Sequence, residues 1–120
     1  MADVTPRIAA GAPVIQSYSA EGFVIGGRGY KGAVLIVGGV VRELQLEALS
    51  VLTESQLRLE GISYLIIGGG EKAQLAPKLV VEALKKRGIV SEPMSTPAAC
   101  RTHNVLLAEE RQFATLLLPV

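Results

Sequence analysis

Short apolar runs punctuated by glycine dominate the first part of the chain. From Val14 the pattern predicts β-structure, with a strand at residues 23–25 and a turn at residues 26–29 whose glycines tolerate positive φ. Residues 33–37 form a continuous apolar run, which is typical of a strand covered on both faces. Two glycines end that run, and residues 40–46 predict a further strand. The N-terminal part is therefore predicted to be rich in strands.

A short helix is predicted next. Thr53 has Gln56 three residues further on, which is the capping-box pattern of a helix start. Leu52 and Leu57 occupy the hydrophobic-staple positions around that start. Gly61 follows within two turns, so we expect this helix to be brief.

A buried strand and a longer helix follow. Residues 64–67 are apolar or aromatic and predict a strand that ends in a glycine turn. Proline fits best in the first turn of a helix, so Pro77 places the next helix start near Ala76, and Gly88 marks its end. The predicted apolar stripe of this helix consists of Leu79, Val80, Ala83 and Leu84.

The last part of the chain continues the alternation. Residues 89–90 predict a strand, a helix opens at Thr96 and runs to about Glu110, and residues 113–118 predict the final strand. A β-rich part followed by β-α-β-α-β predicts the α/β class. In that class, helices pack on a parallel or mixed β-sheet.

The pattern predicts one domain preceded by an arm. Residues 1–13 are rich in alanine, proline and glycine, which predicts a loosely ordered N-terminal arm. Residues 14–120 suffice for one core and are too few for two. We expect no signal peptide, because no basic stretch precedes an apolar core near the start. We also expect no transmembrane segment, because no run approaches the roughly 20 apolar residues of a bilayer span.

Composition and charge narrow the classes of function. Apolar residues make up 49% of the chain and charged residues 19%, which suits a packed interior. A net charge of +1 gives no concentrated basic face, and two Phe and three Tyr give no base-stacking platform, so nucleic acid is not an expected partner. Cys100 is the single cysteine, which excludes an internal disulfide and a cysteine zinc site. We expect a reducing compartment such as the cytoplasm.

The glycine turn after the strand at residues 64–67 imitates a dinucleotide-binding fingerprint. Gly68, Gly69 and Gly70 follow a strand as in G-x-G-x-x-A, and a carboxylate lies near the end of the next strand. In that motif the helix starts within the turn and aims its N-terminus at the pyrophosphate. Pro77 delays the helix start here, so a tight strand-to-helix connection is the favoured interpretation.

The start of the last predicted helix has several residues whose side chains are candidates for binding or catalysis. Thr96 is the predicted N-cap and Pro97 the first helical residue, a start that can attract an anion. Cys100 and His103 lie three residues apart on one face, and a nearby imidazole can lower the pKa of a thiol. No carboxylate obviously orients the histidine, and two ligands are too few for a metal. A small buried thiol is therefore favoured over a nucleophile.

Another face of the same helix is more polar. Arg101, Asn104, Ala108 and Arg111 share it by their spacing of three, four and three. This face is a candidate to bind a carboxylate, a phosphate or a protein. The alternative is a solvated face with Arg111 paired to nearby glutamates. Asparagine is a mediocre helix residue, so the Asn104 amide is also a candidate to bind the backbone of a neighbouring loop.

Residues 91–106, SEPMSTPAACRTHNVL, resemble the signature of a small family long classed as a domain of unknown function. The likeness extends over most of the chain and includes Tyr18 before the first predicted glycine-bounded strand and Tyr30 before the buried run. The mitochondrial members of that family are assembly factors for respiratory complex I, the NADH:ubiquinone oxidoreductase. The resemblance implies a three-layer domain around a mixed sheet and implies no established catalytic residues.

The chain departs from the family pattern in three ways. His103 stands where the family usually has tyrosine, so an essential imidazole is not expected there. Leu44 falls roughly where many relatives have tryptophan. We expect no targeting arm before the domain, so the resemblance implies a bacterial, cytoplasmic relative.

Together these observations predict a non-enzymatic protein-interaction or assembly domain related to the complex I assembly factors. The expected partner is a protein, such as a respiratory-complex assembly protein, and no catalytic residue, metal or cofactor is predicted. The predicted binding residues are Thr96, Arg101, Thr102, Asn104, Gly68, Gly69 and Gly70. The alternative is a domain that binds a small molecule or an anion, using the Gly68 to Gly70 turn and the helix that starts near Thr96.

Overall fold

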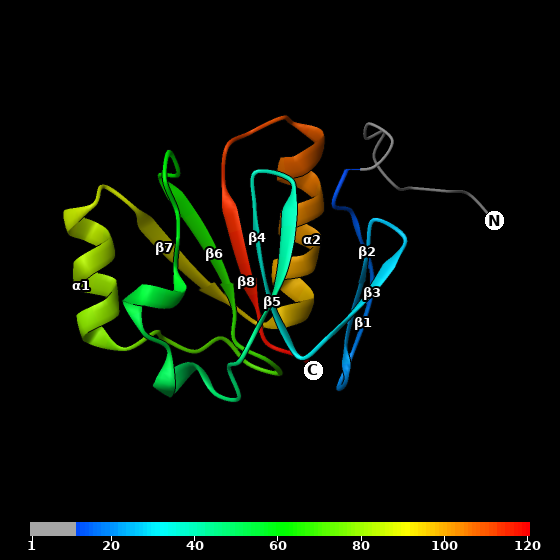
Figure 1. Cartoon of the computed structure of the whole chain (residues 1–120), viewed down its shortest axis with the longest axis horizontal. Helices are drawn as coiled ribbons and strands as arrows, with labels where there is room; N and C mark the ends of the chain where they lie inside the picture. Colours follow the sequence, from blue (N-terminus) through cyan, green and yellow to red (C-terminus); the bar gives the residue numbers. More distant parts are fainter. Residues whose placement is uncertain (1–11) are drawn as a thin grey trace.

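The computed structural model describes residues 12–120, in which five strands come first and strands alternate with α-helices in the second half (Figure 1). The strands are β1 (Ile15–Ser19), β2 (Gly22–Ile25), β3 (Arg28–Lys31), β4 (Ala33–Val37), β5 (Val40–Leu44), β6 (Tyr64–Gly68), β7 (Val90–Met94) and β8 (Ala114–Leu117). The α-helices are α1 (Lys78–Lys86) and α2 (Thr96–Ala108). Two short 3-10 helices, η1 (Leu49–Val51) and η2 (Glu54–Gln56), lie between β5 and β6.

Two sheets organise these elements. The strands β1, β2 and β3 form a small antiparallel sheet, and the other five form a sheet of order β5-β4-β8-β6-β7. In the larger sheet β6 is parallel to β7 and β8, whereas β4 is antiparallel to β5 and β8. The succession β6-α1-β7-α2-β8 after a β-rich part confirms the predicted order and the mixed sheet.

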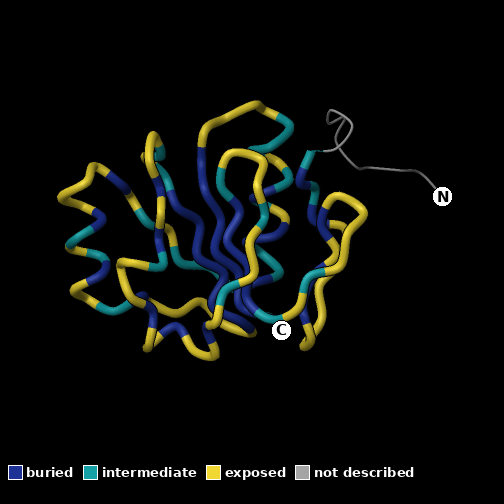
Figure 2. Tube along the Cα trace, in the orientation of Figure 1, coloured by how far each residue is buried: buried dark blue, intermediate teal, exposed yellow. Residues whose placement is uncertain are grey.

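The central strands β4, β8 and β6 are apolar because both faces of the larger sheet are covered (Figure 2). One face, with Leu35 and Leu65, packs against α1 and the 3-10 helices. The opposite face, with Val34 and Ile66, packs against α2 and the small sheet. The domain therefore has three layers around a mixed sheet, which is the arrangement that the family resemblance implied.

The strand β7 is longer than the sequence indicated. The predicted strand covered residues 89–90, whereas β7 runs to Met94 and includes Pro93. Proline has no N–H to donate, which usually argues against a strand. β7 lies at the edge of the sheet, where an outward-facing proline breaks no ladder hydrogen bond.

The apolar stripe of α1 also differs from the prediction. Val80 and Leu84 are buried as expected, but Leu79 is 81% exposed, so its predicted place in the core is wrong. The helix begins at Lys78, and its buried side is centred on Val80 and Leu84. Successive helical residues are rotated by about 100°, which turns Leu79 away from that side.

The helix predicted at Thr53 exists only as the 3-10 turn η2. The backbone N–H of Thr53 donates to Oε1 of Gln56 at 3.0 Å, which confirms the capping-box pairing from the glutamine side. Leu52 and Leu57 are both buried, as their staple positions predicted. These two leucines pack in the core and so hold the segment between β5 and β6 against the domain.

The predicted N-terminal arm lies mostly outside the described residues, since only Ala12 and Pro13 of it are described. Pro13 is buried, and its carbonyl oxygen lies 2.8 Å from Nε2 of His103. The described end of the arm is therefore packed against the domain. Within residues 12–120, neither α-helix has the length and apolar content needed to cross a bilayer.

Candidate functional site

The start of α2 is fixed by its own hydrogen bonds. Ser95, not Thr96, is the N-cap, and its hydroxyl accepts from the backbone N–H of Ala98 at 3.3 Å. Thr96 is the first helical residue, so Pro97 occupies the second position and the predicted cap was one residue too late. A proline still fits there, because the first-turn N–H groups have no intrahelical partner.

Thr96 joins α2 to the glycine turn. Its buried hydroxyl accepts from the N–H of Gly70 at 2.9 Å and donates to the carbonyl of Leu118 at 2.7 Å. Its own N–H donates to the carbonyl of Gly70 at 2.7 Å. The structure thus brings Thr96 and the turn together, as predicted, but the hydroxyl faces the interior.

The glycine turn is closed against the rest of the chain. Gly68 lies directly under α2, because a Cβ there would stand 3.1 Å from the Ala99 Cβ. The N–H of Gly69 donates to Met94 at 2.9 Å, and its carbonyl accepts from the Gln74 side chain at 2.8 Å. Because the amides of the second and third glycines already have partners, the turn offers no phosphate cradle of the dinucleotide kind. This geometry gives no support to the anion-binding alternative.

The exposed face of α2 differs from the predicted one. Arg101 is exposed, Thr102 is half-buried, and Val105 is 51% exposed one turn after Arg101. Asn104 instead points to the small sheet, where its amide oxygen accepts from the N–H of Ile15 and its Nδ2 donates to the Ile15 carbonyl, both at 2.9 Å. The expectation that Asn104 binds backbone is confirmed, and its partner is strand β1.

The single thiol lies in the core. Cys100 is buried in the core between α2 and the sheet. Burial raises the pKa of Cys100 to about 12, against a weaker opposing effect of Arg101. The structure therefore gives no support to the nucleophile hypothesis, and the burial of Cys100 confirms the buried-thiol interpretation.

Both ring nitrogens of His103 are hydrogen-bonded to other residues of the domain. Nε2 lies 2.8 Å from the carbonyl oxygen of Pro13, which can only accept, so Nε2 carries the proton. Nδ1 lies 2.8 Å from the hydroxyl of Thr115 and accepts from it. Burial lowers the pKa of His103, with a smaller opposing effect from the Pro13 hydrogen bond, so the ring is neutral. Its edge also meets the ring of Phe113, with centroids 5.2 Å apart.

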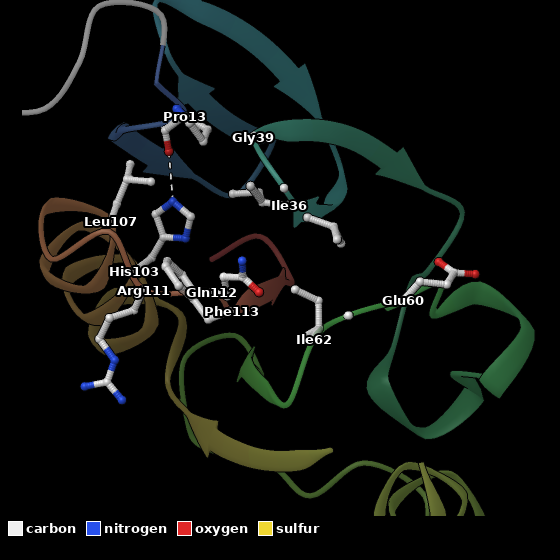
Figure 3. A pocket seen from close by; sticks show the side chains of 13 residues that line it. Pro13, Ile36, Gly39, Glu60, Ile62, His103, Leu107, Arg111, Gln112 and Phe113 are labelled. Atoms are coloured by element: carbon white, nitrogen blue, oxygen red, sulfur yellow. Dashed lines mark hydrogen bonds between the residues drawn. The ribbon is translucent and has the colours of Figure 1, made fainter. Parts of the chain in front are cut away.

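A cavity of about 320 Å³ opens beside this histidine (Figure 3). Its apolar wall includes Ile36, Ile62, Leu107 and Phe113. Arg111 and Glu60 lie at its margins, with their charged ends directed away from His103 (Figure 3). Such a space can hold an apolar side chain or ring. Among the described lining residues, the only imidazole already has both nitrogens hydrogen-bonded within the protein, so His103 is not a free base.

Sequence reasoning missed this cavity. Its walls come from the end of the arm, β4 and the β4–β5 turn, the loop before β6, and α2 with the residues after it. No local pattern links these segments. Arg111, expected to pair with a nearby glutamate, does so with Glu109 at 3.8 Å. No group of three or more potential metal ligands lies together in the described part of the chain.

The neutral state of His103 predicts a pH-dependent stability. The pKa of this ring is lowered from 6.5 in the folded protein, so the unfolded chain binds more protons below pH 6.5. Stability is then complete above pH 6.5 and falls as the pH decreases from there toward the lowered folded pKa. The loss has a slope of at most about 1.4 kcal/mol per pH unit. Urea unfolding at pH 7.5 and pH 5 measures it.

The control for this prediction is His103→Gln, which cannot titrate. Since the chain has one histidine, we expect the variant to be less stable than the wild type at pH 7.5 and to lose much less stability on acidification. An equal pH dependence in both proteins would show that His103 is not the titrating group.

Comparison with known proteins identifies the family. The family described as protein of unknown function (DUF498/DUF598) matches residues 15–118. The NADH dehydrogenase (ubiquinone) 1 alpha subcomplex assembly factor 3 of Danio rerio is 34% identical over 97% of this chain and 70% of its own length. An uncharacterized protein of Rhodobacter capsulatus is 33% identical over 92% of this chain and 88% of its own length.

A solved structure has the same fold. The crystal structure described as an outer membrane protein from Bartonella henselae aligns with a TM-score of 0.79 at 28% identity, covering 95% of this chain and 99% of its own. The chain spans only 60% of the assembly factor 3 of Xenopus tropicalis and 64% of the human one. The family match and the relatives confirm the resemblance seen in residues 91–106: the chain belongs to the DUF498/DUF598 family.

Proposed function

We propose that this protein is a non-enzymatic assembly factor that acts by binding a protein partner, as the names of its vertebrate relatives suggest for them. The observation that carries the proposal is the exposed face of α2, where Arg101 and Val105 stand one turn apart. An arginine beside an exposed apolar side chain is the composition that protein interfaces favour. The proposed site of action is the cytoplasm.

Hydrogen bonds hold the first turn and the middle of α2 in place, which favours binding by its exposed face. Ser95 caps the helix, and Thr96 ties its first turn to the glycine turn and to the residue after β8. Asn104 ties the middle of the helix to β1 through two hydrogen bonds. A surface held in one conformation loses little entropy when a partner binds. In this proposal Arg101 and Thr102 contact the partner, whereas Thr96, Asn104 and the glycines position them.

Affinity capture from the native cell tests the proposal. We expect the wild-type protein to recover respiratory-complex subunits or assembly proteins. Arg101→Glu should lower that recovery by about tenfold, because it places a carboxylate where the partner meets a cation. Arg58→Glu, the same charge change at another exposed arginine, should recover as much as the wild type. A wild-type capture without any such protein, or equal recovery by Arg101→Glu, would contradict the proposal.

A further inference from the structure

The outer edge of β5 carries backbone groups that point away from the domain. β5 and β7 form the two edges of the larger sheet (Figure 1). A two-residue turn of two positive-φ glycines, residues 38–39, joins β4 to β5, so the flanking Val37 and Val40 exchange backbone hydrogen bonds. This pattern alternates along the hairpin, so the N–H and C=O groups of Val41 and Glu43 point outward. Within residues 12–120 these backbone groups have no hydrogen-bond partner.

The other strand edges in the described part of the chain are interrupted. On β1 the side chain of Asn104 binds both backbone groups of Ile15. On β3 a carboxylate oxygen of Glu43 accepts from the N–H of Lys31 at 2.8 Å. On β7 Pro93 has no N–H to offer. β5 has neither a proline nor a register shift, so it is the edge best suited to accept a further strand.

The outward groups of β5 specify an extended occupant. Val41 and Glu43 are two positions apart, which places their backbone groups about 6.6 Å from one another along the strand. Another extended chain presents donors and acceptors at that spacing, whereas a helix uses its own backbone groups internally. Two residues of an antiparallel strand satisfy all of these groups, each by exchanging a pair of hydrogen bonds.

The side chain of Arg42 adds a second requirement. Arg42 pairs with Leu35, so it lies on the α1 face of the sheet, where it is exposed and forms no ion pair within residues 12–120. Two apolar residues flank it on that face, Val40 at 59% exposure and the half-buried Leu44. The Glu43 carboxylate lies on the opposite face and is bound to β3. An acidic residue opposite Arg42 would therefore complement this edge.

A second copy of the same edge is a poor match for it. When two β5 strands pair around a two-fold axis, all outward groups are used if Val41 lies opposite Glu43 of the other copy. Arg42 then lies directly opposite its own counterpart, on the same face. Like charges directly opposite each other are destabilising, so this register disfavours self-pairing and favours a foreign strand.

We propose that β5 is a docking edge for an extended segment of a protein partner. The segment adds to the larger sheet as an antiparallel strand and places an acidic residue opposite Arg42. This inference rests on the proposal that the protein works by binding a protein. It adds a contact surface that does not include Arg101, and its affinity comes chiefly from backbone hydrogen bonds.

A designed strand tests the backbone requirement. The probe is a fluorescein-labelled peptide of about seven alternating threonines and valines with a glutamate at its centre. We expect saturable binding by fluorescence anisotropy. N-methylation of the two amides that flank the glutamate residue, which face β5, should weaken binding at least about tenfold. N-methylation of the glutamate's own amide, which points away, should leave binding unchanged. Absence of saturable binding, or equal binding of the two methylated peptides, would overturn the proposal.

A charge exchange tests the role of Arg42. Arg42→Glu should weaken binding of the glutamate peptide about tenfold and strengthen binding of the same peptide with a central lysine. Arg28→Glu makes the same change at an exposed arginine of β3 and should alter neither. Equal effects at both positions would show a general charge effect and overturn the proposal. Arg101→Glu should bind the peptide normally, so failure of this experiment and failure of the capture experiment are distinguishable.

Amide hydrogen exchange measured by NMR locates the binding. Saturating glutamate peptide should slow exchange of the Val41 and Glu43 amides at least about fivefold. The amide of Gly29, on the edge strand β3, should exchange at an unchanged rate. Protection of other residues without these two would place the peptide elsewhere and overturn the proposal. If both amides were protected in the free protein and lost that protection on dilution, a second copy would occupy the edge and the proposal would be wrong.

A photo-crosslinking residue in place of the exposed Val40, introduced in the native cell, tests the natural occupant. We expect the crosslinked segment, sequenced by mass spectrometry, to contain an acidic residue with apolar residues two positions to either side. Capture of this chain alone, of segments without such a residue, or of no protein would contradict the proposal.

Discussion

Thr96→Val is expected to destabilise the protein by about 2–4 kcal/mol. Valine has nearly the shape of threonine, so the packing under α2 would change little. The N–H of Gly70 and the carbonyl of Leu118, which now meet the Thr96 hydroxyl, would both be left buried without a partner. Each such orphaned group costs about 1–3 kcal/mol. Urea unfolding monitored by circular dichroism measures the change in the free energy of unfolding.

The matched control for this result is Thr102→Val, the same substitution six residues later on α2. Thr102 is half-buried, so we expect a change within about 0.5 kcal/mol. If the two variants were equally stable, the Thr96 hydroxyl would not be what joins the glycine turn to the helix.

Gly68→Val is expected to cost about 3 kcal/mol or more, because α2 leaves no room for a side chain. A Cβ at residue 68 would stand 2.9 Å from Cδ2 of Leu117 and 3.1 Å from Cα of Thr96. The Leu117 methyl can rotate away, but the helix backbone can yield only if α2 moves off the sheet. The same unfolding measurement applies.

Gly29→Val is the control for Gly68→Val. Gly29 also lies in a strand, but nothing stands within 4 Å of a Cβ placed there. We expect a neutral or slightly stabilising effect, because valine suits an exposed strand and restricts the unfolded chain. A comparable loss at both positions would mean that strand glycines are needed for another reason than close packing.

The order of elements could be predicted from the sequence because periodicity and helix-capping residues are local signals. The apolar run that became β4 and the delayed helix start at Pro77 are of this kind. Leu79 was misplaced because a nine-residue helix with several apolar positions allows two stripes, and only the sheet beneath it selects one. The predicted strand at residues 89–90 stopped short of Pro93, which β7 tolerates at the edge of the sheet, and a sequence does not reveal which strand lies at an edge.

The candidate site was predictable only in part, for a similar reason. The sequence indicated that Thr96, Asn104 and the glycine turn were special, and the structure brings Thr96 and Gly70 into contact. The sequence could not indicate that the Asn104 amide binds the backbone of Ile15, which lies 89 residues away along the chain. His103 is held by Pro13, which lies 90 residues away, and by Thr115 on the next strand, so the neutral state of its ring had no signal within the helix itself.

The position of β8 has a consequence for how the protein is made. This strand is the last element of the chain, yet it lies between β4 and β6 at the centre of the larger sheet. A ribosome releases the N-terminal strands first, and they cannot join β6 until β8 has left the exit tunnel. The sheet therefore closes only after residues 114–117 have been synthesised and have left the tunnel, and until then the apolar faces of β4 and β6 stay incompletely covered.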